Sequence, residues 1–129
     1  KMVHNGIEYG LMQAYAEGFS ILKAKKPLNL DLQQIAHIWQ KGSVVRSWLL
    51  DLTAGALDKN PTLEGLDAFV PDSGEGRWTV TEAIDLNISA PVITESLIRR
   101  LRSREENNFT DRMISIMRGA FGGHDVKKI

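Results

Sequence analysis

Apolar side chains recur at helical spacing along most of the chain and predict about six helices. Over residues 3–25 the apolar positions fall three or four residues apart, which indicates one long amphipathic helix. These positions are Ile7, Leu11, Ala14, Tyr15, Phe19 and Leu22. Pro27 is expected to end the helix, since proline cannot continue it. At 1.5 Å per residue the helix is about 34 Å long, so we expect a partner subunit to cover part of it.

Five shorter helices are predicted to follow, each bounded by capping or helix-breaking residues. Asp31 can cap the second helix and Ser43 the third, and Pro91 suits the first turn of the fifth. The expected ranges are 31–40, 44–58, 78–87, 90–106, and a last helix from Asn108 or Thr110 to about Gly119.

Residues 62–76 are the least regular part of the pattern. Leu63, Leu66 and Phe69 predict one short helical turn, and residues 71–76 read as a loop. Residues 122–129 read as a tail. No alternating strand pattern and no internal repeat is present, so the prediction is an all-α fold with the long first helix as its spine.

The composition limits the function classes. The chain has 129 residues, enough for one domain with a core, and its 16 basic and 16 acidic residues balance. This balance gives no reason to expect nucleic acid or a membrane as a partner. The absence of cysteine excludes disulfides and thiolate chemistry but does not constrain the compartment. No apolar run approaches the length of a membrane span and no signal peptide is visible, and we expect a cytoplasmic protein. The three histidines lack paired spacing, so no metal site is expected.

Candidate chemistry lies at the start of the chain. At about 100° per residue, one quarter to one third of the first helix carries four polar side chains, with Tyr9 at the edge. The four are Lys1, His4, Asn5 and Glu8. The face therefore combines a base candidate, an acid candidate, an amide and an imidazole. A mixed polar face is also typical of solvated helix surface, and the spacing alone does not separate the two interpretations.

The ten-residue string KMVHNGIEYG resembles the catalytic helix of decarboxylating 6-phosphogluconate dehydrogenases, within the β-hydroxyacid dehydrogenase superfamily. Four later segments resemble the same family in the same order. They are WQKGSVVRS from Trp39, GEGRWT from Gly74, ITESLIRR from Ile93, and RGAFGGH from Arg118. The resemblance thus covers nearly the whole chain and implies the all-helical C-terminal catalytic and dimerisation domain, residues 1–129, of a short-form enzyme.

The resemblance implies a role for each candidate residue. Lys1 would be the general base at the substrate 3-hydroxyl and Glu8 the acid that protonates C1 of the enediol. His4 and Asn5 would bind substrate hydroxyls or the carboxylate. Tyr9 and Arg100 would hold the phosphate of 6-phosphogluconate. Lys1 must be neutral to accept a proton, and Glu8 must carry a proton near neutral pH, so we expect both side chains to be desolvated beside the substrate.

The remaining implications concern partners. Arg118 and His124 would reach the active site of the partner subunit in a homodimer. NADP or NAD would be the cofactor, but no glycine-rich turn follows a strand in this chain, so its dinucleotide-binding domain is expected upstream. The chain starts on the motif without Met, which we interpret as a piece of a longer protein.

The tryptophans Trp39, Trp48 and Trp78 are expected in the core or the dimer interface.

One departure from the family pattern keeps a second interpretation open. Long family members place a phosphate-binding lysine where this chain has Ser73, and Arg77 lies near in sequence. A dehydrogenase of another β-hydroxyacid therefore stays an alternative, as does a non-catalytic helical dimerisation module. The choice between NADP and NAD, the oligomeric state beyond a dimer and the pathway are not readable from these residues.

Overall fold

The computed structural model describes residues 1–106, 108–123 and 125–128, and within these ranges the fold is all-helical, as predicted. Its elements are α1 (Met2–Ala24), the 3-10 helix η1 (Lys26–Leu28), α2 (Leu32–Trp39), α3 (Trp48–Lys59), α4 (Glu75–Asp85), α5 (Pro91–Arg102) and α6 (Phe109–Gly122). None of these helices is both long and apolar enough to cross a membrane.

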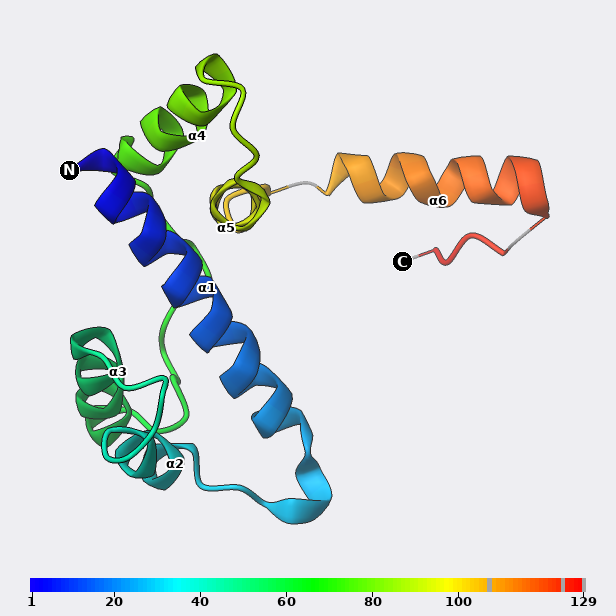
Figure 1. Cartoon of the computed structure of the whole chain (residues 1–129). Helices are drawn as coiled ribbons and strands as arrows, with labels where there is room; N and C mark the ends of the chain where they lie inside the picture. Colours follow the sequence, from blue (N-terminus) through cyan, green and yellow to red (C-terminus); the bar gives the residue numbers. More distant parts are fainter. Residues whose placement is uncertain (107, 124, 129) are drawn as a thin grey trace.

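The α1 helix is the spine around which the other helices are placed (Figure 1). It has 23 residues, and at 1.5 Å per residue it is about 34 Å long. The α4 and α5 helices pack against its first half and against each other, whereas α2 and α3 form a pair near its other end. A small core of Ala36, Ala54 and Leu57 joins α2 to α3, with Phe19 of α1 packed against it.

The first half of α1 is buried along its glycines rather than along its apolar positions. Gly6 and Gly10 are buried, whereas Ile7 and Leu11 are 52% and 43% exposed. A Cβ atom on Gly6 would lie 2.8 Å from Cγ2 of Thr79 on α4. The missing side chains therefore let α4 and α5 approach α1 closely, and the apolar stripe beside them stays free in a single chain.

The start of α3 lies later than predicted. Ser47, not Ser43, caps it by accepting a hydrogen bond from the Leu50 N–H at 2.9 Å. Ser43 instead accepts from the Val45 N–H at 3.2 Å, within a turn. Both serines can cap a helix, and only the path of the chain between α2 and α3 selects one of them.

Other boundaries also differ. Glu75 and Gly76 belong to α4 rather than to the preceding loop, α5 ends at Arg102 rather than near residue 106, and α6 continues to Gly122. Residues 62–69 form turns instead of a helical turn, with Leu63 at φ 58°.

One of the three tryptophans packs within the chain, and the predicted place of the other two in a dimer interface stays a prediction. The Trp39 ring packs on Phe19 with centroids 5.4 Å apart, but Trp48 and Trp78 are 78% and 57% exposed.

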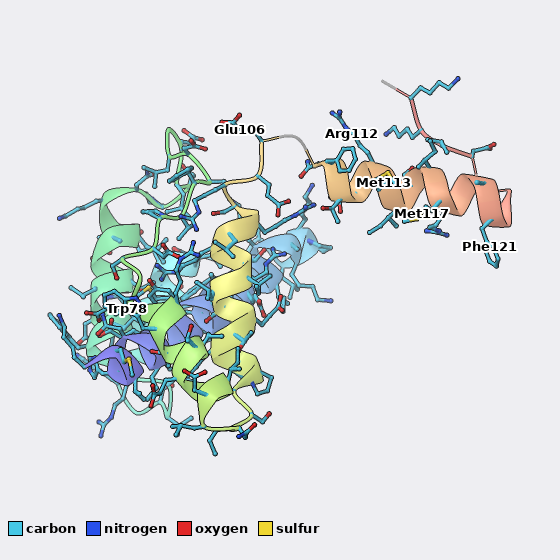
Figure 2. The ribbon with its side chains drawn as sticks, turned by 90° about the horizontal axis from the view of Figure 1, so that it is seen from above. Trp78, Glu106, Arg112, Met113, Met117 and Phe121 are labelled. Carbon is cyan, nitrogen blue, oxygen red and sulfur yellow. The ribbon has the colours of Figure 1, made fainter. Side chains whose placement is uncertain are left out.

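The α6 helix extends away from the other helices (Figures 1 and 2). None of its described residues is buried, although one side carries large apolar side chains. Figure 2 labels three of them, Met113, Met117 and Phe121, and Phe121 is 98% exposed.

Candidate active site

The polar face of α1 forms one line of side chains, as its spacing predicted. His4 Nδ1 lies 3.0 Å from Glu8 Oε1, one helical turn away. Asn5 is half-buried on the same helix, and Lys1 stands at its N-terminus. The structure therefore brings the predicted acid and the predicted imidazole into direct contact.

A second helix contributes to this face through a residue that the sequence patterns did not single out. Glu75, in the first turn of α4, places Oε1 3.6 Å from Lys1 Nζ. Its other oxygen, Oε2, is buried and has no hydrogen-bond partner in the described part of the chain. Glu75 belongs to the GEGRWT segment, but only the crossing of α1 and α4 places it beside Lys1.

Thr79 fixes that crossing. Its hydroxyl is buried and lies 2.7 Å from the Met2 carbonyl oxygen and 2.9 Å from the Glu75 carbonyl oxygen, so it can donate to either. An unpaired buried hydroxyl would be costly, and this arrangement satisfies it while joining the two helices next to Lys1. The start of α1 is thus held against the start of α4.

Tyr9 and Arg100 meet beside the polar face. The Tyr9 ring is 5% exposed, packs over Gly76, and carries the Arg100 guanidinium carbon 3.5 Å from its centroid. This is a cation–π contact, which favours arginine because its planar group can lie flat on the ring. Arg100 Nη1 also donates to the Pro71 carbonyl at 3.0 Å. The pair that was predicted to hold phosphate is therefore assembled from α1 and α5.

This chain alone does not shield Lys1 and Glu8, the two acid–base candidates, from water. The Lys1 side chain is 82% exposed and the Glu8 side chain 41% exposed. Any further burial has to come from substrate, from another domain or from another chain.

The two tail candidates lie elsewhere. Arg118 is exposed on α6 and lines a shallow 420 Å³ cavity with Asp111, Ile114, Ser115 and Asp125, away from α1. His124 lies outside the described residues. One chain therefore does not bring Arg118 to the α1 face.

The described geometry defines a helical domain whose long first helix presents a lysine, a carboxylic acid and a tyrosine, and an arginine of α5 lies on the tyrosine ring. Residues 1–128 match the family described as 6-phosphogluconate dehydrogenase, C-terminal domain, and the chain belongs to this family. The match confirms the resemblance that the sequence motifs indicated.

Relatives agree with this assignment. The chain is 44% identical over 128 residues to "Putative 6-phosphogluconate dehydrogenase YqeC" of Bacillus subtilis (strain 168), covering 99% of this chain and 43% of that protein. It is 43% identical over 129 residues to the NAD(+)-dependent, decarboxylating 6-phosphogluconate dehydrogenase of Haloferax volcanii, with the same coverage. The NADP(+)-dependent, decarboxylating enzyme of Bacillus subtilis is 39% identical over 110 residues, covering 80% of this chain and 23% of that protein. The chain thus spans less than half the length of these relatives.

Proposed function

We propose that this chain supplies the acid–base and substrate-binding residues of an enzyme that oxidises and decarboxylates 6-phosphogluconate to ribulose 5-phosphate and CO2. The observation that carries the proposal is the joint placement of the α1 polar face and the Tyr9–Arg100 contact. A substrate with a hydroxy acid at one end and a phosphate at the other fits such an arrangement. The activities for which the relatives are named support this substrate.

The proposed chemistry assigns one proton to each of two side chains. Neutral Lys1 takes the proton of the 3-hydroxyl while the hydrogen on C3 leaves as hydride, and a ketone forms. Protonated Lys1 then gives its proton to the ketone oxygen while the C1–C2 bond breaks and CO2 departs, which leaves an enediol. Glu8 delivers a proton to the carbon that carried the carboxylate, Lys1 takes back the proton of the enediol hydroxyl so that the ketone of the product forms, and His4 and Asn5 hold the neighbouring oxygens.

NAD or NADP, when bound, supplies the acceptor for the hydride. Nucleotide-binding folds of the Rossmann type need a strand followed by a glycine-rich turn, and the described ranges of this chain contain no strand. We therefore assign no residue of this chain to hold the cofactor, and we propose that a separate domain binds it.

The test is an assay of the complete protein that carries this chain. Reduction of each nicotinamide cofactor is followed by absorbance with 6-phosphogluconate, gluconate and 3-hydroxyisobutyrate. We expect reduction only with 6-phosphogluconate and a loss of at least 10²-fold in kcat in Lys1→Met, in line with the usual effect of removing an acid–base group. Lys25→Met, at the exposed C-terminal end of the same helix, is the matched control and should keep full activity.

Two results would contradict the proposal. Turnover of an unphosphorylated acid alone would favour another β-hydroxyacid dehydrogenase, for which Ser73 would be part of the specificity. Full activity in Lys1→Met and Glu8→Gln, or no turnover of any substrate by the native protein, would favour a helical dimerisation module.

We further propose that the protein is a homodimer in which α6 of one subunit packs on the other subunit. Exposure of Met113, Met117 and Phe121 to water is unfavourable, because burying a side chain of this kind contributes about 1.5–3 kcal/mol of free energy. A mostly apolar groove of 520 Å³ runs between α1 and α3, lined by Met12, Phe19, Leu49, Leu57 and other residues. We propose this groove of the second copy as the site that receives α6.

This arrangement would bring Arg118 and His124 to the active site of the other subunit. A complementation experiment tests it directly: Lys1→Met and Arg118→Ala chains are mixed so that subunits exchange at random. If the tail acts across the interface, each mixed dimer has one complete site, and activity should return to about a quarter of the native value. If Arg118 serves the site of its own subunit, the mixture stays as inactive as each variant is alone. If Arg118 serves no site, the activity of the mixture equals the average of the two variants measured separately.

A further inference from the structure

Three consecutive loop residues before α4 each bind different side chains, and these include Tyr9 and the arginine on its ring. The Pro71 carbonyl accepts from Arg100, the Asp72 carboxylate pairs with Arg77 and Arg104, and the Ser73 N–H donates to the Tyr9 hydroxyl at 3.3 Å. Since neighbouring Cα atoms are 3.8 Å apart, the backbone positions that hold these groups lie within about 8 Å of each other. The structure therefore gathers three arginines and a tyrosine around one short segment.

Asp72 organises two of these arginines. Its Oδ2 lies 2.9 Å from Arg77 Nε and 3.6 Å from Arg104, and its side chain is only 8% exposed. A buried carboxylate needs such partners, and it fixes the positions of two guanidinium groups that would otherwise repel each other. Arg77 comes from α4 and Arg104 follows the end of α5, so their proximity depends on the packing of both helices on α1.

The charges in this cluster do not balance. Arg77, Arg100 and Arg104 carry three positive charges and Asp72 one negative charge, which leaves two positive charges around residues 71–73, the segment that contacts the Tyr9 hydroxyl through Ser73. Within the ranges that the structure describes, the two Nη atoms of Arg77 donate no hydrogen bond, and its side chain is 49% exposed. Guanidinium donors that remain available in a positively charged cluster suit a phosphate dianion, which accepts several charge-assisted hydrogen bonds at once.

We propose that Arg77 and Arg104, positioned by Asp72, extend the Tyr9–Arg100 contact into a phosphate site and make the protein select phosphorylated over unphosphorylated sugar acids. This inference rests on the proposed function and adds to it the residues that replace the lysine absent at Ser73. An extra guanidinium at a dianion is a charge-assisted contact, so each arginine is expected to change affinity by about tenfold or more.

The experiment uses the complete protein and two readouts. The first is the dissociation constant of inorganic phosphate, measured by calorimetric titration. The second is kcat and KM for 6-phosphogluconate and for gluconate. The variants are Arg104→Gln and Arg77→Gln, with Arg99→Gln as the matched control, because Arg99 is an exposed neighbour of Arg100 on α5 that takes no part in the cluster.

We expect both glutamine variants to weaken phosphate binding and to raise KM for 6-phosphogluconate about tenfold or more, with kcat and the gluconate kinetics little changed. Arg104→Lys should recover part of the loss, because it keeps the charge without the planar donors. Arg99→Gln should match the native protein. The lysine variant keeps the test valid if Arg104→Gln lowers the melting temperature.

Two results would overturn the inference: unchanged phosphate affinity in both glutamine variants, or an equal loss for gluconate and 6-phosphogluconate. These results are distinguishable from failure of the proposed function. If the native protein binds inorganic phosphate through these arginines but does not oxidise 6-phosphogluconate, the substrate assignment fails and the phosphate site stands. If it oxidises 6-phosphogluconate and the arginine variants behave as the native protein does, only the phosphate site fails.

Discussion

The first half of α1 and the α6 helix are both amphipathic, but they differ in how they meet the rest of the chain. In α1 the side that contacts α4 and α5 carries Gly6, Gly10 and the ring of Tyr9, all buried. In α6 no described residue is buried, and Phe121 is almost fully exposed. Close packing of α1 therefore depends on small residues that admit a neighbouring helix. The apolar side of α6 has no such neighbour among the described residues, and it is the surface that we propose a second subunit to cover.

The largest expected difference between the two regions comes from deleting apolar side chains. Leu50 is fully buried, so Leu50→Ala should lower the free energy of unfolding by about 3 kcal/mol, through lost burial and the cavity left behind. Phe121→Ala should change it by less than about 0.5 kcal/mol in the separated subunit. Urea denaturation at a protein concentration low enough to separate subunits measures both. A comparable loss in the two variants would contradict the contrast between the regions.

The glycine contact is the next test. A Cβ atom on Gly76 would overlap the Tyr9 ring, so Gly76→Ala should cost about 1–3 kcal/mol through displaced packing. Gly18 lies in α1, the other helix of this contact, and no neighbouring atom would meet its Cβ. Gly18→Ala should therefore stabilise the folded chain by about 0.5–1 kcal/mol. Thermal denaturation of the two alanine variants measures the difference, and equal signs would show that the α1–α4 contact is looser than described.

A smaller effect is expected at the start of α3, within the packed part. Ser47 caps this helix and its Oγ also lies 2.9 Å from the Tyr15 hydroxyl, so Ser47→Ala should cost about 1 kcal/mol. Ser43→Ala, which loses only a turn contact, should cost a few tenths of a kcal/mol. Denaturant titration of both variants decides which serine begins the helix. The reverse order would restore the start that the sequence predicted.

The smallest expected effect is a pH dependence on the outer surface of the α2–α3 pair. His37 Nε2 lies 2.7 Å from Asp58 Oδ1. This hydrogen bond is the largest cause that raises the pKa of His37 above its ordinary 6.5, and the hydrogen bond to Gln40 is the second. The hydrogen bond from His37 is the largest cause that lowers the pKa of Asp58 below its ordinary 3.8, and the hydrogen bond from Gln33 is the second. The His37–Asp58 pair therefore contributes its full stabilisation of the folded chain between about pH 3.8 and pH 6.5.

The sign of the pH effect follows from those two directions. The contribution of His37 is lost as the pH rises through its raised pKa, and that of Asp58 is lost as the pH falls through its lowered pKa. We expect the melting temperature of His37→Gln to lie furthest below the native value between these limits and to approach it above them. A difference that does not change with pH would show that the pair is not ionised in the folded chain.

The sequence by itself determined the helical class, most of the helix positions and the polar face of α1, because these depend on local spacing and on capping residues. The side chains of His4 and Glu8 meet because a helix places residues four apart on the same side. The family followed from five ordered motifs for a similar reason, since motifs are local strings. The Asp31 cap of α2 was also readable, because its hydrogen bond to the Gln34 N–H spans only one turn.

Only the tertiary structure decided which side of α1 is buried, which serine begins α3, and what surrounds the loop at Asp72. Each of these depends on residues that are distant in sequence: Thr79 against Gly6, Glu75 beside Lys1, and Arg104 against Asp72. Periodicity marks an apolar stripe but does not say whether α4, a solvent layer or a second subunit lies against it. The packing of helices on α1 selects among these, because close approach is possible only where the glycines leave room.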